Sequence, residues 1–253
     1  MEFEYDVKEN EILLKRCYGT EERIEVPAQI EGMPVTVLAP YIFSQARREP
    51  DQKAAICGNQ VKEIVLPDTV REIGNYAFYG CYYLEALTLS HRTHDIAGGA
   101  FTGCRHLKNL TFRMEQAEGY CMKDVLSEVH HEMKVKLVYP NAVCTLLFPE
   151  YYESYDEIAP AHIFGRNIVG EGFRARQSFR EGVLDFAQYD KIFPQACVDE
   201  SEATLGRLAL DRVRYATELS ETPRGLYEAY LKAHGGYLIR RITDDRDLEL
   251  AEY

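Results

Sequence analysis

Apolar residues recur at one fixed interval between residues 61 and 112. The landmarks that return every 23 residues are Leu66, Leu89 and Phe112, then Phe78 and Phe101, and finally Cys81 and Cys104. A unit of this length is too short to bury its own apolar face, so neighbouring units must stack and share one elongated core. The pattern therefore predicts a repeat protein.

Each unit contains one short strand. The pattern L-x-x-L-x-L begins at Leu84, and its counterpart L-x-x-L-x-F begins at Leu107. Period-two spacing places Leu87 and Leu89 on the inward face. The outward positions of the same strand are Ala86, Thr88 and Ser90. Because each unit returns to its start through a turn, the strands centred near Val65, Thr88 and Thr111 are predicted to be sequential parallel neighbours.

The chain before residue 61 predicts a cap and a diverged unit. Alternating apolar residues at 3–7 and again at 12–18 indicate a β-hairpin, which can cover the open end of a repeat core. In the diverged unit Ile24 aligns with Ile64, and Tyr41 and Phe43 align with Tyr76 and Phe78. An insertion at 44–60 makes this unit longer, and loops absorb such additions at little cost.

The repeat decays after Phe112. Residues 113–133 read as a helix with Val125, Leu126, Val129 and Met133 on one face, and residues 135–140 and 143–149 read as strands. Beyond Pro149 the apolar period changes from two to 3.6, which predicts helices over 203–219 and 222–233. We therefore expect a leucine-rich repeat domain at 1–148 and an all-α domain at 149–253.

The repeat motif resembles a known family. The pattern V-x-x-I-x-L-P-x-x-V-x-x-I-G-x-x-A-F-x-G-C, followed by L-x-x-L-x-L, is similar to the BspA-like leucine-rich repeat family over about residues 20–140. The resemblance implies an α/β repeat fold, a solenoid with a parallel strand ladder, and a role in adhesion or protein binding, commonly as an exported protein. The last residues, 237–253, loosely resemble the second helix and turn of an ankyrin-like unit.

Composition narrows the class of partner. The formal net charge is −12, which disfavours nucleic acid, because binding to phosphate backbones comes from Lys and Arg displacing counterions. The N-terminus has no basic region followed by an apolar one, and no apolar run is long enough to span a bilayer. Seven cysteines without a compact disulfide pattern fit a reducing compartment. We expect a cytoplasmic protein without membrane partners.

Three motifs suggest chemistry only superficially. Residues 165–170 have the glycine spacing of a phosphate loop, but Glu171 and Gly172 stand where Lys and Ser or Thr are needed. Cys81 and Cys104 are one repeat apart and are better interpreted as stacked core residues. His130 and His131 are adjacent, so they do not share a helix face as a metal-binding pair would. No catalytic, cofactor-binding or metal-binding residue is predicted.

Three arginines, Arg174, Arg176 and Arg180, are close together in an acidic chain. One interpretation pairs them with the local carboxylates Glu171, Glu181 and Asp185. The other gives them an acidic partner or a bound anion.

Two hypotheses of function follow. The first is a non-catalytic protein-protein interaction module without cofactors, which binds a protein partner through the outward strand face and the inserted loop. Its candidate partner-binding residues are Glu63, Val65, Ala86, Thr88, Asn109, Thr111, Arg113, Arg47 and Arg48. The alternative is an enzyme or enzyme subunit whose site lies in the helical domain, with the repeats recruiting substrate.

Overall fold

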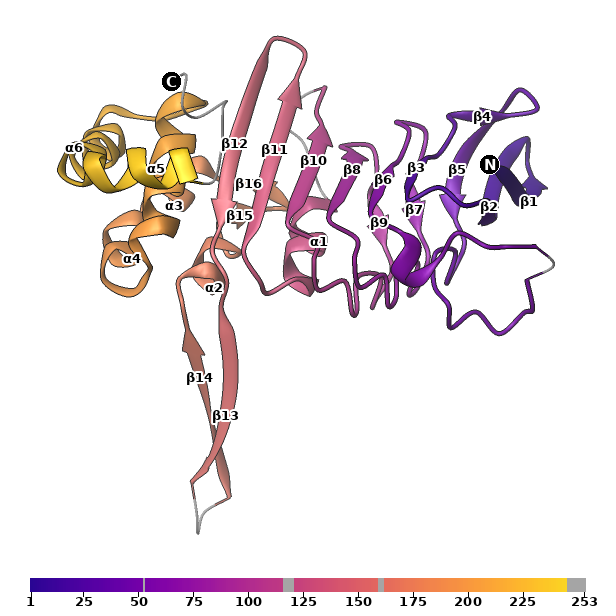
Figure 1. Cartoon of the computed structure of the whole chain (residues 1–253), viewed down its shortest axis with the longest axis horizontal. Coiled ribbons are helices and arrows are strands. Elements are labelled where there is room, and N and C mark those ends of the chain that lie inside the picture. Colours follow the sequence, from indigo (N-terminus) through magenta and orange to yellow (C-terminus); the bar gives the residue numbers. More distant parts are fainter. Residues whose placement is uncertain (52, 116–120, 159–161, 245–253) are drawn as a thin grey trace. The chain divides into compact units, whose positions relative to one another are not determined.

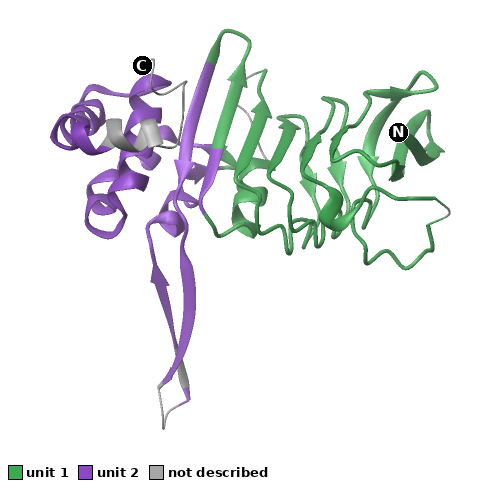
Figure 2. Ribbon diagram, in the orientation of Figure 1, with its two compact units in different colours: residues 1–131, 135–142, 181–183 green, residues 132–134, 143–180, 184–253 purple. Residues whose placement is uncertain are grey.

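The structure is a computed structural model that describes residues 1–51, 53–115, 121–158 and 162–244. The chain divides into two compact units (Figure 2). Unit 1 holds residues 1–131, 135–142 and 181–183, and unit 2 holds 132–134, 143–180 and 184–253.

A ladder of strands forms the first sheet of unit 1. Its neighbours, in order, are β3 (Arg23–Glu25), β6 (Glu63–Val65), β8 (Ala86–Ser90), β10 (Asn109–Arg113) and β11 (Met133–Tyr139) (Figure 1). From β3 to β10 the pairing is parallel, and Thr88 lies opposite both Val65 and Thr111. The predicted strand order and register are confirmed, because stacking units one repeat apart puts equivalent residues side by side.

A second sheet lies in the same unit. It runs β1 (Glu2–Lys8), β2 (Glu11–Tyr18), β5 (Met33–Leu38), β7 (Glu72–Ile73) and β9 (Asp95–Ile96), and β4 (Gln29–Ile30) pairs with β5. β1 and β2 form the predicted antiparallel hairpin, whereas β5, β7 and β9 are parallel. Three turns of the solenoid therefore contribute a strand to both sheets, namely β3 with β5, β6 with β7, and β8 with β9.

Equivalent side chains stack in the core between these sheets. The rings of Phe43, Phe78 and Phe101 follow one another with centroids 5.7 and 5.2 Å apart. The Cys81 thiol donates to the Phe43 carbonyl, and the Cys104 thiol donates to the Phe78 carbonyl, so each cysteine contacts the preceding turn. Both cysteines are buried, as the stacked-core interpretation predicts.

Two local expectations for unit 1 were wrong. Ser90 was placed outward with Thr88, but only 1% of it is exposed, and its hydroxyl accepts from the Arg92 N–H at the strand end. The helix expected to reach Met133 is α1 (Cys121–Glu128), and Met133 instead begins β11. The Glu128 carboxylate accepts the N–H groups of Gly99 and Phe101, so the end of α1 is held against the turn of the third repeat.

All of β12 (Ala142–Phe148) except its first residue lies in unit 2, and this segment was predicted as a strand. The helices that follow are α2 (Gly172–Ala175), α3 (Phe186–Asp190), α4 (Phe193–Asp199), α5 (Glu202–Arg214) and α6 (Glu221–Asp244). The helical C-terminal part is thus confirmed. Of the ankyrin-like pattern at 237–253, residues 245–253 lie outside the described residues.

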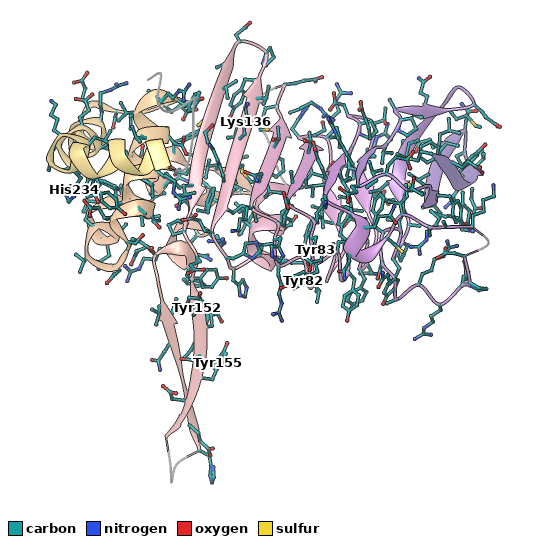
Figure 3. All side chains as sticks on the ribbon, in the orientation of Figure 1. Tyr82, Tyr83, Lys136, Tyr152, Tyr155 and His234 are labelled. Atoms are coloured by element: carbon teal, nitrogen blue, oxygen red, sulfur yellow. The ribbon has the colours of Figure 1, made fainter. Side chains whose placement is uncertain are left out.

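The expectation that everything after residue 149 is helical was wrong for the first part of this segment. β13 (Tyr152–Ile158) and β14 (Ile163–Val169) form an antiparallel hairpin, and β15 (Phe179–Arg180) and β16 (Val183–Leu184) are two shorter strands. Tyr152 and Tyr155 point to opposite faces of β13 and are 62% and 63% exposed (Figure 3). Because neither face of this hairpin is buried, its strands do not need alternating apolar and polar residues, and the sequence shows no such alternation.

The helices of unit 2 pack around a core that contains one buried ion pair. Phe193, Leu205 and Leu208 form part of the apolar cluster. Beside it, Arg212 donates from Nε and Nη2 to the two carboxylate oxygens of Asp190, at 2.7 and 2.8 Å. The Tyr227 hydroxyl donates to the same carboxylate at 2.8 Å, so Asp190 accepts a hydrogen bond from a second side chain.

Candidate functional site

The outward face of the strand ladder gathers seven of the predicted partner-binding residues. Register places Glu63, Ala86 and Asn109 in one row across β6, β8 and β10. A second row holds Val65, Thr88 and Thr111, and Arg113 ends β10. Asn109 is exposed and the others are half-buried by their neighbours. The result is a flat face with small side chains at its centre.

Charged groups border this face and several are already paired. Arg113 Nε lies 2.7 Å from the Asp68 carboxylate, and its Nη2 donates to the Leu66 carbonyl. Arg23 pairs with Glu63 at 3.4 Å. Lys136 on β11 is exposed and adds a cation to the far end of the ladder (Figure 3). The centre of the face is therefore uncharged and its border is mixed in sign.

The two arginines of the inserted loop have different environments. The Arg47 side chain is 10% exposed and donates to both Glu4 oxygens and to Glu49. Hydrogen bonds from Arg47, and then from Tyr18, lower the pKa of Glu4 to about 2. Arg48 is exposed and forms no ion pair with any residue that the structure describes. Arg47 thus attaches the loop to β1, and Arg48 is the loop arginine available for binding.

A buried arginine that sequence reasoning missed fixes the start of the same loop. Arg16 is 1% exposed, and its Nη1 donates to the carbonyls of Ile42 and Ser44 at 2.8 Å. Its Nε and Nη2 donate to the Asp51 carboxylate at 2.8 and 2.6 Å. The available signal was the position of Arg16 in the inward series of β2, after Ile12 and Leu14. A charge there requires partners from a distant part of the chain.

A ledge of exposed tyrosines was also missed. Tyr76, Tyr79, Tyr82 and Tyr83 lie on one turn and are 38–45% exposed. The Tyr76 and Tyr79 rings are in edge-to-face contact, and so are the rings of Tyr82 and Tyr83 (the latter two are labelled in Figure 3). Tyr82 and Tyr83 also contact His106 of the next turn. The sequence signal was present, because these four tyrosines occur within eight residues and are interspersed with the predicted core residues Phe78, Cys81 and Leu84. We refer to these four tyrosines and His106 as the tyrosine ledge.

The arginine run of unit 2 makes mostly local contacts. Arg174 donates to Glu171 at 2.8 Å, and Arg180 lies 3.8 Å from Asp185. Arg176 is buried and donates to the carbonyls of Pro149 and Gly172. Local pairing with carboxylates is confirmed for Arg174 and Arg180, whereas Arg176 donates to backbone carbonyls.

Two of the motifs that suggested chemistry can be placed among the residues that the structure describes. No group of three or more His, Cys, Asp or Glu there could hold a metal ion. Burial raises the pKa of the Cys104 thiol to about 12, so this sulfur is a poor nucleophile at neutral pH. His130 and His131 follow the end of α1, and His131 Nε2 contacts the Leu107 carbonyl at 2.5 Å.

The repeats match a known family. Residues 52–141 match, in six copies, the family described as the BspA type leucine rich repeat region. This segment is a BspA-type leucine-rich repeat region. The parallel ladder and the stacked Phe and Cys residues are the structural form of these repeats. Leucine-rich repeats are commonly protein-interaction or surface modules, and the family is typically non-enzymatic.

Two solved structures resemble this chain. A T. pallidum leucine-rich repeat protein is 24% identical, with 47% of this chain and 54% of that chain covered and a TM-score of 0.37. A leucine rich cell surface protein from Faecalibacterium prausnitzii is 19% identical, with 55% and 41% covered and a TM-score of 0.32. The chain thus spans about half the length of the first of these proteins. No curated protein matches the chain.

Among the described helices, none combines the length and the apolar character that crossing a bilayer requires.

Proposed function

We propose that this protein is a non-catalytic protein-interaction module of the cytoplasm, and that its leucine-rich repeat region binds a protein partner through the strand face and the inserted loop. The observation that carries the proposal is the flat face built by Val65, Thr88 and Thr111 in exact register. A centre without charged side chains and a polar border match the general anatomy of a protein interface, in which charged residues are depleted at the core and the rim is polar.

The chemistry of this face favours protein over other partners. It has no basic excess for phosphate and no aromatic ring on which a base or sugar could stack. Specific interfaces bury roughly 800 Å² on each partner, which is more than three to five strands about 4.8 Å apart supply. We expect the inserted loop with Arg48 to supply the additional contact area that the strands lack.

The test is a pull-down from native cytoplasm followed by affinity measurements on the captured protein. The triple variant Thr88→Glu, Thr111→Glu and Asn109→Arg keeps the buried face intact and should raise the dissociation constant at least tenfold, about 1.4 kcal/mol. Thr102→Glu, on an exposed turn off the strand face, is the control and should bind as the wild type does. Unchanged affinity in the folded triple variant would place the site elsewhere.

A further inference from the structure

A cavity of about 510 Å³ lies beside the inserted loop in unit 1. Leu13, Ala39, Pro40 and Tyr41 supply an apolar floor, and the charged side chains lie on β2 and the loop. A concave apolar surface with a few polar groups at its border is the usual form of a site for one side chain or a small ligand.

The wall formed by the loop is held in place before any partner arrives. Arg16 joins the carbonyls of residues 42 and 44 to the Asp51 carboxylate, so both ends of the segment 44–51 are tied to one buried guanidinium. Arg47 then attaches the middle of the segment to Glu4 at 2.8 Å. A site with a fixed wall loses little conformational entropy on binding.

The floor is equally rigid. Tyr41 has a φ of 60°, a left-handed conformation that is unfavourable for a residue with a side chain, and its ring stacks 5.2 Å from that of Tyr76. The equivalent position one repeat after Tyr76 is Gly99, over which the Tyr76 ring lies so closely that a Cβ would be 2.4 Å from it. The aromatic stack thus runs from the cavity toward the tyrosine ledge.

The charges around the cavity leave one cation without a counter-ion. Lys15 lies 3.4 Å from Asp6 and 3.7 Å from Glu4, and Arg47 pairs with Glu4 and Glu49. Arg48 has no such pair among the residues described in the structure. An apolar floor beside one unpaired guanidinium is complementary to an apolar group that carries a carboxylate close by.

We propose that this cavity binds an extended segment of a partner protein, inserting an apolar side chain against Leu13 and Tyr41 and placing the carboxylate of an adjacent acidic residue on Arg48. This inference rests on the proposed function and names the chemistry that the inserted loop recognises. The chain's net charge of −12 does not prevent it, because exposed charges farther apart than about 8 Å are largely screened at physiological salt.

The test uses the full chain labelled with ¹⁵N and capped tetrapeptides followed by backbone amide shifts. The probe is Ac-Ser-Leu-Glu-Ser-NH2, and the matched probes replace Leu by Ala or Glu by Gln. We expect the Leu-Glu probe to shift the amides of Lys15, Tyr41 and Arg48 with a dissociation constant in the range of about 1–10 mM. Each matched probe should bind about fivefold more weakly.

Variants separate the two contributions. Arg48→Gln should abolish the preference for Glu over Gln, whereas Lys108→Gln, an exposed cation away from the cavity, should retain it. Leu13→Gln should weaken all the probes. The inference is overturned if the three probes bind equally, if the Leu-Glu probe gives no shift at these amides, or if Arg48→Gln leaves the preference intact.

The outcome is distinguishable from that of the proposed function. The strand-face triple variant should respond to the peptides as the wild type does, because its substitutions lie outside the cavity. If a partner binds through the strand face but the peptides do not bind the cavity, only this inference is refuted. If the peptides bind the cavity but no partner depends on the strand face, only the proposed role of the strand face is refuted.

Discussion

At the residue scale, the positions that the sequence predicts best are those that every repeat uses in the same way. Leu87 and Leu89 are 1% and 0% exposed because the strand that carries them faces the shared core. Arg16 and Arg212 are buried as completely, yet neither could be placed from the sequence. Their partners lie far away in the chain. A repeating pattern of apolar residues carries no information about a contact such as that between Arg16 and Asp51.

The inward and outward assignment can be tested at neighbouring positions. Leu89→Asp puts an unpaired carboxylate into the core and should cost about 4 kcal/mol or more of unfolding free energy. Thr88→Asp lies on the outward face and should cost less than about 1 kcal/mol. Urea unfolding of both variants measures the difference, and equal losses would contradict the assignment.

The buried ion pair of unit 2 gives a second prediction at this scale. Asp190→Ala leaves the Arg212 guanidinium buried without its carboxylate and should cost about 3–5 kcal/mol. The double variant Asp190→Leu with Arg212→Met removes both charges and should recover much of that loss. Lys191→Ala, an exposed neighbour, is the control and should stay within about 0.5 kcal/mol. A double variant as unstable as the single one would argue against an uncompensated charge as the cause.

At the scale of elements, strands with one buried face could be predicted and strands without one could not. β8 and β10 alternate clearly between inward and outward residues, and their register follows from the repeat. β13 and β14 present exposed side chains on both faces, so they lack that alternation. The tyrosine ledge and the cavity beside the inserted loop depend on how turns and an insertion fold over the ladder, which the period alone does not specify.

The attachment of the inserted loop to the hairpin cap should depend on pH. The pKa of Glu4 is lowered from 4.5 to about 2, with the hydrogen bond from Arg47 as the largest cause. A depressed carboxylate pKa stabilises the fold above pH 4.5, and this contribution is lost as the pH falls from 4.5 toward 2. Unfolding free energy measured across that interval should fall less steeply for Glu4→Gln than for the wild type. Parallel curves would show that the contact does not couple to stability.

At the scale of the whole molecule, each compact unit contains its own core and its own cysteines. Cys81 and Cys104 lie in the repeat stack of unit 1, and Cys144 lies in unit 2. Cys197 is exposed, so it reports on accessibility without unfolding. Residues 1–148 and 149–253 remain our proposed domains. Cys144 lies before the boundary between them but inside unit 2, so the thiols test the independence of the two compact units.

We predict that the two units unfold in separate cooperative transitions. Each unit buries its own apolar residues, and residues that pack in one continuous core tend to unfold together. Pulse labelling of thiols at increasing urea should modify Cys197 in native protein. Cys81 and Cys104 should become reactive together, since they occupy equivalent positions in adjacent turns, and Cys144 should do so at a different urea concentration. Burial keeps the pKa of the Cys104 thiol at about 12 and that of Cys144 at about 11, so labelling of either sulfur reports exposure. A single midpoint for Cys81, Cys104 and Cys144 would instead mean that the chain unfolds as one cooperative unit.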